Sequence, residues 1–267
     1  MDNIRLISLY SGSSGNAFLV TTPVGNFLID GGKSARRLTA ALRGVGVEPS
    51  ELSFVLLTHD HTDHTAALPN FLKKTPLPVY LPIESAPCFS VHEALRGLLL
   101  PRPPIFDETL PSGIRVRSFP TLHDSRGSFG FRVEIPFRGK TFSLGYATDL
   151  GRVTDDVREG LRGCHAVVLE SNHDSEMLRR GPYPPELKRR ISSPRGHLSN
   201  EACADLLPEL FDAGARVFFL AHLSRENNRP ELAYDAALSA LGERAEILVE
   251  DPEEAIEWNT EGMICFN

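Results

Sequence analysis

Six residues of the sequence hold four side chains that can bind metal ions, in the pattern His59-x-His61-x-Asp63-His64. In an extended turn, residues two apart point the same way, so His59 and His61 can hold one cation between them. Asp63 and His64 can then face a second cation beside the first. Imidazole suits zinc, copper, iron and nickel, and a carboxylate widens the choice towards manganese. The spacing therefore predicts a metal centre for two cations.

The segments on either side of this cluster predict a rigid support for it. Residues 54–57 form a short apolar segment typical of a buried strand, and residues 66–72 carry apolar side chains at helical spacing. A turn between a strand and a helix lets ligands project into a cleft. The alternative interpretation is a polar, histidine-rich loop at the surface.

Three further side chains that can bind metal follow other predicted strands. They are His123 after residues 115–119, Asp149 after residues 140–146 and His222 after residues 217–220. Loops at strand ends often carry chemistry, and a carboxylate such as Asp149 can bridge two cations. An isolated histidine is more often structural, so His123 gains its interest from the first cluster. Asp30, after a further predicted strand, is expected either to orient a histidine ligand or to cap the next helix.

The composition, with 41% hydrophobic and 24% charged residues, is that of an ordinary globular protein. Because we find no repeat, low-complexity tract or linker, we expect a single α/β domain over residues 1–267. Within it, residues 84–100, which include His92, are predicted to be mostly helical. The proline-rich residues 101–104 are predicted to be an irregular connection.

The sequence carries no sign of a membrane segment or of export. No apolar run approaches the roughly 20 residues that span a bilayer, and residues 1–20 lack the basic start and apolar core of a signal peptide. The four cysteines (Cys88, Cys164, Cys203 and Cys265) are far apart, which argues against a thiolate zinc site and against a disulfide framework. We therefore expect a cytoplasmic protein that does not bind membranes.

The formal net charge of −7 does not exclude nucleic acid as a partner, because two bound divalent cations would return positive charge to the cleft. One segment is locally basic and contains Arg179, Arg180, Lys188, Arg189, Arg190 and Arg195. Of these, Arg189, Arg190 and Arg195 are expected to hold a nucleic-acid backbone, because guanidinium groups can bind phosphate through two hydrogen bonds. The alternative is the ordinary solvated face of a helix.

Short hydrogen-bonding side chains on two loops are expected to bind phosphate at the metal centre. They are Ser14 and Asn16 in the glycine- and serine-rich loop 11–16, and Ser224 and Asn227 after His222. Backbone N–H groups of the first loop can also line an anion site. The alternative for that loop is a simple connection between two strands.

The seven candidate ligands, from His59 to His222, together resemble the ligand set of the metallo-β-lactamase-fold hydrolases. The resemblance implies an αββα sandwich with a dinuclear metal site at one edge of two packed sheets. It also implies one ion held by His59, His61 and His123 and another held by Asp63, His64 and His222, with Asp149 bridging them. Asp30 matches a supporting position of that family rather than a ligand.

Five further segments resemble the bacterial YycJ (WalJ) branch of the same family, and they are residues 11–16, 147–151, 170–174, 196–200 and 221–228. Members of that branch are described as 5′ to 3′ DNA exonucleases linked to mismatch repair. The resemblance therefore implies a metal-dependent phosphodiesterase that acts on duplex or single-stranded DNA ends. The stretch between Asp149 and His222 is too short for the large nucleic-acid-binding insertion of some nuclease relatives, so the core surface is expected to bind DNA.

Phosphodiester hydrolysis needs an activated water, neutralised charge and a protonated leaving group. Two divalent cations, Mn²⁺ or Zn²⁺ with iron as a third candidate, would supply the first two requirements. Asp63 is expected to orient or deprotonate the water. His197 is expected to be the general acid, because it begins a predicted helix near the phosphate site and matches a histidine of related tRNA-processing nucleases.

Two other functions remain open from the sequence. One is the hydrolysis of a small phosphodiester such as a cyclic nucleotide, which needs the same chemistry. The other is a metal-stabilised regulatory module that binds a partner without turnover, although structural metal sites are normally closed. The sequence also leaves open the choice of metal, the polarity of cleavage and the oligomeric state.

Overall fold

Two β-sheets form the centre of the structure, a computed structural model that describes residues 3–89 and 92–261. The first sheet has the order β14-β1-β2-β3-β4-β5-β6, with β1 (Arg5–Tyr10), β2 (Ala17–Thr21), β3 (Asn26–Ile29), β4 (Leu52–Leu56), β5 (Val79–Pro82), β6 (Leu99–Arg102) and β14 (Ile256–Asn259). The second has the order β13-β12-β11-β10-β9-β8-β7, with β7 (Asp107–Thr109), β8 (Arg115–Pro120), β9 (Phe129–Phe137), β10 (Lys140–Ala147), β11 (Ala166–Glu170), β12 (Val217–Ala221) and β13 (Glu246–Val249). In each sheet an antiparallel half continues into a parallel half, β3 to β6 and β10 to β13.

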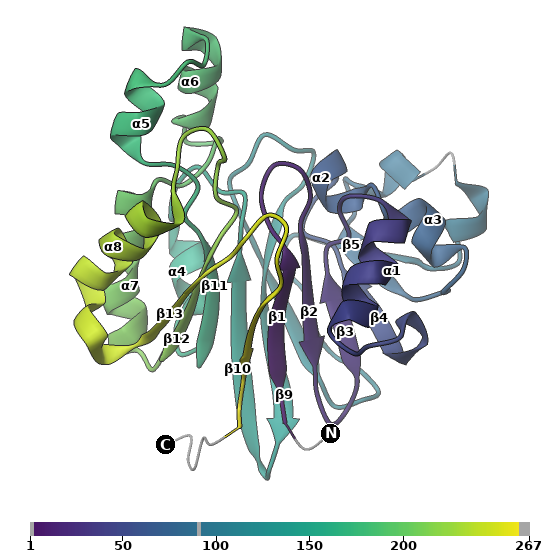
Figure 1. Cartoon of the computed structure of the whole chain (residues 1–267). Helices are drawn as coiled ribbons and strands as arrows, with labels where there is room; N and C mark the ends of the chain where they lie inside the picture. Colours follow the sequence, from purple (N-terminus) through teal and green to yellow (C-terminus); the bar gives the residue numbers. More distant parts are fainter. Residues whose placement is uncertain (1–2, 90–91, 262–267) are drawn as a thin grey trace.

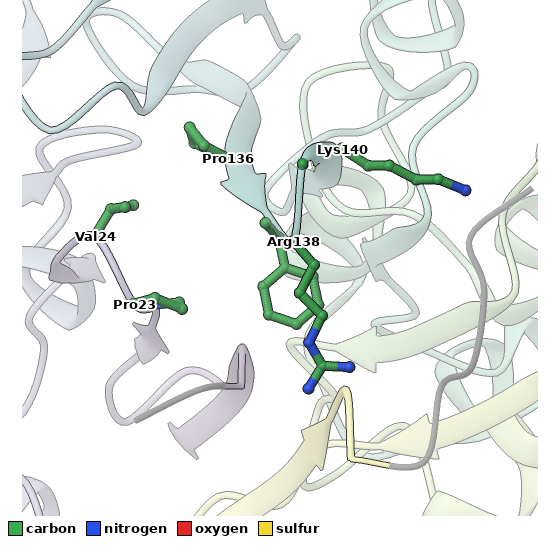
Figure 2. A pocket seen from close by; sticks show the side chains of 7 residues that line it. Pro23, Val24, Pro136, Arg138 and Lys140 are labelled. Atoms are coloured by element: carbon green, nitrogen blue, oxygen red, sulfur yellow. The ribbon is translucent and has the colours of Figure 1, made fainter.

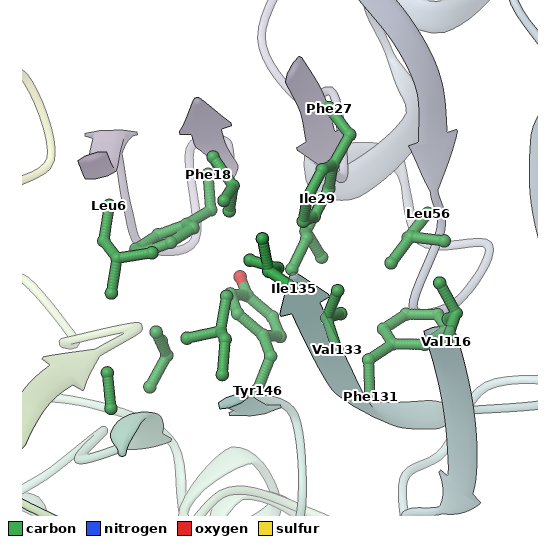
Figure 3. Close-up of a cluster of buried hydrophobic side chains, with 14 of the residues drawn as sticks. Leu6, Phe18, Phe27, Ile29, Leu56, Val116, Phe131, Val133, Ile135 and Tyr146 are labelled. Atoms are coloured by element: carbon green, nitrogen blue, oxygen red, sulfur yellow. The ribbon is translucent and has the colours of Figure 1, made fainter. Parts of the chain in front are cut away.

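Large apolar side chains fill the space between the two sheets (Figure 3). In β2, Phe18 points into this core while its neighbour Leu19 points to the outer face, as the period of two in a strand requires. The Phe18 ring centroid lies 5.6 Å from that of Tyr146 and 5.4 Å from that of Phe219, both in the second sheet. Burial of these side chains holds the sheets face to face.

Helices cover the outer faces of both sheets (Figure 1). They are α1 (Ala35–Gly44), α2 (Thr62–Thr65), α3 (Leu68–Leu72), α4 (Asp155–Leu161), α5 (Ser175–Arg180), α6 (Pro185–Ile191), α7 (Asn200–Asp212) and α8 (Pro230–Leu241), with short 3₁₀ turns η1 (Pro49–Glu51), η2 (Ala86–Phe89), η3 (Glu93–Leu95) and η4 (Gly242–Arg244). Apolar side chains of α1 and α3 pack on the first sheet, and those of α4, α7 and α8 pack on the second. The arrangement is the predicted αββα sandwich, which confirms the fold class.

The predicted helix over residues 84–100 is wrong. The described part of this segment holds only the turns η2 and η3, with His92 directly before η3, and then strand β6. Pro101, expected in an irregular connection, lies within β6, which is the edge strand of the first sheet. An edge strand tolerates proline because its missing N–H breaks no bond to a second neighbour. Strands β7 and β14 were also not predicted, because each is too short to show a clear pattern in the sequence.

The carboxyl ends of the parallel strands meet along one edge of the sandwich. The backbone leaves three of these strands through residues in the left-handed region, Asp30 (φ 63°), Asp149 (φ 57°) and His222 (φ 59°). Residues other than glycine rarely adopt this conformation because it strains the backbone. Such strain is often found at functional sites. Among the described residues no helix is long and apolar enough to cross a membrane.

Candidate metal centre

The seven predicted ligands converge at this edge of the sandwich. Three groups of donor atoms each lie within 4.8 Å of one another, and they are His59 with His61 and His123, His59 with His64 and Asp149, and Asp63 with His64 and His222. The groups share members, so they lie side by side. The structure thus brings together side chains that the sequence spreads from residue 59 to residue 222.

The first group is a cluster of three imidazoles. His59 is fully buried, and its Nδ1 lies 3.0 Å from the Thr58 hydroxyl oxygen. The Nδ1 of His123 lies 3.2 Å from the carbonyl oxygen of Gly196. On the other side of the His123 ring, Nε2 lies 3.2 Å from Nδ1 of His61. Each outer contact fixes a ring, so that the remaining nitrogens face one another.

In the second group, carboxylates hold two histidines from behind. Asp30 Oδ2 lies 2.8 Å from His64 Nδ1, and Glu170 Oε1 lies 2.9 Å from His222 Nδ1. The opposite nitrogens, His64 Nε2 and His222 Nε2, face Asp63 Oδ2 at 3.4 and 3.6 Å. A carboxylate behind an imidazole fixes its tautomer and raises its basicity as a ligand. Asp30 therefore lies where the resemblance placed it, as a support for a ligand.

The Asp149 carboxylate lies between the two groups. Its Oδ1 is 3.7 Å from His123 Nε2, and its Oδ2 is 3.3 Å from His64 Nε2. Oδ1 also lies 3.5 Å from His222 Nδ1, so the carboxylate is close to histidines of both groups. This is the placement that a bridging carboxylate needs.

Several buried polar atoms at the centre have no hydrogen-bond partner among the described residues. They include His59 Nε2, His222 Nε2 and Asp149 Oδ2. A buried polar atom without a partner costs free energy, and native proteins rarely leave several together. Nitrogen and carboxylate donors in this number suit divalent transition metals. The donor set fits divalent metal binding.

Mutual electrostatics set the charges of these groups. Burial opposes a charge on Asp149, yet the neighbouring His222 and His64 hold its pKa well below the usual range. Burial likewise disfavours charged His64, but Asp149 and Asp30 raise its pKa well above the usual value. By contrast, burial lowers the pKa of His59, which favours the neutral imidazole that a metal ligand requires. Cations must displace the protons on His64 and His222, so metal affinity rises with pH.

Glu170 is a site residue that sequence reasoning missed. It ends β11 with no exposed surface, and its Oε1 lies 2.7 Å from His197 Nδ1 as well as 2.9 Å from His222 Nδ1. Its Oε2 accepts the backbone N–H groups of Leu150 and Leu198 at 2.9 and 3.3 Å. With both oxygens occupied, Glu170 orients two histidines rather than offering a metal ligand. Its place at the end of an apolar strand, like that of the predicted ligands, was the available signal.

His197 lies at the rim of the centre, on the loop before α7. Its side chain is 22% exposed, and the contact of Nδ1 with Glu170 leaves Nε2 on the opposite side of the ring. Burial lowers the pKa of His197, but the Glu170 carboxylate outweighs burial and raises it above the usual value. A histidine whose pKa is raised, at the rim of the donor cluster, is suited to donate a proton.

The four residues expected to bind phosphate divide into two pairs. Asn16 and Asn227 are almost fully buried, so neither faces a ligand. The Asn16 side chain instead holds the site together, since Nδ2 lies 3.3 Å from Asp63 Oδ2 and Oδ1 accepts the N–H of Gly12 at 2.7 Å. Ser14 is exposed, and Ser224 lines a cleft beside His197. Only the two serines are therefore placed to meet a substrate.

The three arginines expected to bind the DNA backbone also differ from one another. Arg190 Nε donates to Asp124 Oδ2 at 2.5 Å, and the Arg195 guanidinium donates to the carbonyl oxygen of His123 at 3.1 and 3.2 Å. Both side chains thus fasten loops around the metal centre. Arg189, on the same helix as Arg190, is exposed.

Two hollows of different size lie at opposite ends of the sandwich. The larger, of about 800 Å³, lies between the β2–β3 and β9–β10 turns and is lined by Pro23, Val24, Pro136 and their neighbours (Figure 2). It shares no residue with the metal centre. A smaller cleft of about 250 Å³ adjoins His197. The candidate site is the smaller cleft, because it adjoins the donor atoms and the larger hollow does not.

Glu250 is a further buried carboxyl near the centre, and its burial leads to a prediction about stability. Burial raises its pKa to about 7 from an ordinary 4.5, although the hydroxyls of Ser11 and Ser8 partly oppose this. The folded state thus holds its proton more tightly than the unfolded state, so stability falls as pH rises from about 4.5 to about 7. Replacing Glu250 by glutamine is expected to remove that loss, about 3 kcal/mol at pH 8.

The measurement is urea unfolding of chelator-treated wild type and Glu250→Gln at pH 4.5 and pH 8, because a nearby cation would itself lower this pKa. The advantage of the variant should be larger at pH 8. An equal difference at both pH values would contradict a buried carboxyl that titrates near neutrality.

Three comparisons with known proteins bear on this geometry. A family model described as "Beta-lactamase superfamily domain" matches residues 25–223. "Exodeoxyribonuclease YycJ" of Bacillus anthracis is 34% identical over 241 residues, which are 88% of this chain and 88% of that protein. "Exodeoxyribonuclease WalJ" of Streptococcus pneumoniae serotype 2 is 32% identical over 238 residues, or 88% of this chain and 87% of that protein. The solved metallo-beta-lactamase fold protein YhfI from Bacillus subtilis is similar in fold, with a TM-score of 0.72 at 17% identity over 97% of this chain and 100% of that chain.

Proposed function

The chain belongs to the beta-lactamase superfamily, and from that membership we propose that it is a metal-dependent hydrolase that degrades DNA from a 5′ end. The observation that carries this proposal is His197, held by Glu170 at 2.7 Å beside a cluster of seven metal-binding side chains. The two exodeoxyribonucleases that it resembles, each over 88% of this chain, support DNA as the substrate. A role in DNA repair belongs to the same proposal.

We assign the metal ligands as the sequence resemblance implied, with His59, His61 and His123 for one cation, Asp63, His64 and His222 for another, and Asp149 between them. When bound, two divalent cations such as Mn²⁺ or Zn²⁺ would lower the pKa of a water and neutralise charge on the phosphate. All other parts of the reaction fall to side chains of the protein.

Asp63 orients the attacking water. Burial opposes its charge, but the neighbouring imidazoles of His222 and His64 hold the pKa of Asp63 below the usual range, so it is a carboxylate at neutral pH and accepts a hydrogen bond. His197 donates a proton to the leaving oxygen from the other side of the site. Glu170 stabilises the charged form of His197 before the transfer and keeps the ring aimed at the cleft.

The direct test uses duplex DNA labelled at either end and incubated with metal-reconstituted protein. A 5′ label should appear at once as a mononucleotide, while a strand labelled at its 3′ end should shorten stepwise. Early release of the 3′ label would reverse the proposed polarity, and internal fragments would show an endonuclease. Cleavage of a small chromogenic diester with intact DNA would instead favour the small-phosphodiester alternative, and metal binding without any cleavage would favour the regulatory module.

Salt dependence tests how the basic segment contributes to DNA binding. Arg190 and Arg195 already have partners in the protein, so we expect few phosphate contacts and a shallow decrease of affinity with salt. Arg189→Ala should weaken binding and reduce the slope of log K against log salt by about 1. Lys73→Ala, an exposed cation after α3, is the matched control and should leave the slope unchanged. If the affinity of the wild type for DNA did not change with ionic strength, the basic segment would have no role in DNA binding.

A further inference from the structure

The cleft beside His197 has a wall that the metal chemistry does not use. Tyr183, Leu187 and Ile191 line this wall of the 250 Å³ space, and His197 and Ser224 line the side near the metal centre. Leu187 and Ile191 are one helical turn apart on α6, so they present one continuous apolar surface. All three side chains are half-buried rather than covered. An apolar surface thus remains open to water next to a strongly charged site.

Hydrogen bonds join this wall to the loop that carries His197. The N–H of His197 donates to the carbonyl oxygen of Ile191 at 2.8 Å, and the N–H of Gly196 donates to the carbonyl oxygen of Ser193 at 2.9 Å. A Cβ atom at Gly196 would lie 2.1 Å from the Ile191 carbonyl oxygen, so this approach requires glycine. The end of α6 and the proposed acid therefore keep a fixed distance from each other.

A second tie joins the wall to the ligands. Arg190, on α6, donates to Asp124 at 2.5 Å, and the other oxygen of Asp124 lies 3.5 Å from Nε2 of His123. The helical pair α5 and α6 stands out beyond the sheets at this edge of the sandwich (Figure 1). The wall is thus part of the site and not a loose appendage.

We propose that Tyr183, Leu187 and Ile191 form a subsite for one nucleobase, that of the end nucleotide cut off in each turnover. The inference rests on the proposed function, because it places the phosphate of that nucleotide between His197 and the metal ligands. A flat base matches a wall of two apolar side chains and one aromatic ring, that of Tyr183. A space of 250 Å³ is smaller than the roughly 300–1,000 Å³ of common ligand pockets, so it takes one base and no duplex.

The subsite has two consequences for specificity. Stacking accepts every base because each has a π face, so the enzyme should remove all four nucleotides at similar rates. Because the space holds only one base, a strand end fits and an uninterrupted strand does not. The wall therefore favours removal of single nucleotides over cutting within a strand.

The test compares Tyr183→Ala with Tyr183→Phe on two substrates, duplexes whose 5′-terminal residue carries either a base or an abasic tetrahydrofuran. Tyr183→Ala is expected to raise KM for the base-bearing end roughly 10-fold or more, the range of a lost stacking contact, while Tyr183→Phe keeps the wild-type KM. On the abasic end the wild type should already show the raised KM, and Tyr183→Ala should add nothing. Tyr234→Ala, an exposed tyrosine on α8, is the control and should match the wild type throughout.

Two results would overturn the subsite while leaving the proposed function in place. One is an active wild type whose KM is unaffected by Tyr183→Ala, and the other is an equal rise in KM for base-bearing and abasic ends. Wild-type protein that leaves DNA intact would remove the proposed function and the subsite with it. Measured metal content and circular dichroism of each variant separate these results from misfolding.

Discussion

Exchanging Asp149 for asparagine is expected to release bound metal and to lower the rate of DNA hydrolysis by at least about 10³-fold, the upper range for loss of one electrostatic stabiliser. The reason is geometric, since Oδ1 lies 3.7 Å from His123 and 3.5 Å from His222, and Oδ2 lies 3.3 Å from His64, so the carboxylate is close to both groups. Losing this charge weakens both groups together. The same change removes the anion that raises the pKa of His64, so this ring loses part of its proton affinity.

Asparagine is the informative substitution because the backbone at Asp149 has φ 57°, a conformation that asparagine tolerates better than alanine. It therefore removes charge without adding strain. Metal per chain, by elemental analysis, and the rate at saturating added metal are the two measurements. Asp235→Asn, an exposed position on α8, serves as the control. Wild-type metal content and wild-type rate in Asp149→Asn would refute a bridging role.

Replacing His197 by alanine is expected to lower the rate by about 10²–10⁴-fold with the metal content unchanged, the range typical of a lost proton donor. His197 also lies within 4.8 Å of Asp149, Glu170 and His222, but its Nδ1 contacts Glu170 at 2.7 Å, so we expect its removal to leave the metal content unchanged. An acid must be protonated to act, and the pKa of His197 is raised by Glu170 although burial opposes this. Activity should therefore be retained below that raised pKa and fall as pH rises through it.

The pH profile distinguishes a proton donor from a merely structural residue. In Glu170→Gln the supporting charge is gone, so the alkaline decline should move to lower pH. In His197→Ala that decline should vanish from the small remaining activity. A His197→Ala variant with full metal content, an unchanged rate and an unchanged profile would show that the leaving group receives its proton elsewhere.

The convergence of the candidate ligands could be predicted from the sequence because their signal is local. A predicted strand ends just before each of His59, Asp149 and His222, and strand ends on one edge of a sandwich meet. The two readings of Asp30 could be separated only by the structure, which puts its carboxylate 2.8 Å from His64 and gives the cap of α1 to Ser34.

The roles that could not be predicted from the sequence depend on contacts between residues far apart in the chain. Glu170 acquires its role only when the loop at His197 returns to the end of β11, 27 positions away in sequence. Asn16 has the side chain of a phosphate ligand, yet its contact with Asp63, 47 positions away, turns it inward. Likewise, the basic segment predicted that Arg190 binds phosphate, but its pairing with Asp124 could not be seen in the sequence. Such contacts are properties of the assembled fold.

The pairing of β1 with β14 has a consequence for biosynthesis. Ile4 donates its N–H to the Thr260 hydroxyl at 3.0 Å, across 256 positions, and Leu6 lies opposite Trp258. During translation, β1 emerges together with β2 and can pair with it, but its other side stays unpaired until residues 256–259 emerge. An unpaired edge of this kind invites association with neighbouring chains. We therefore expect nascent chains of this protein to need protection along the open side of β1 until β14 has been made.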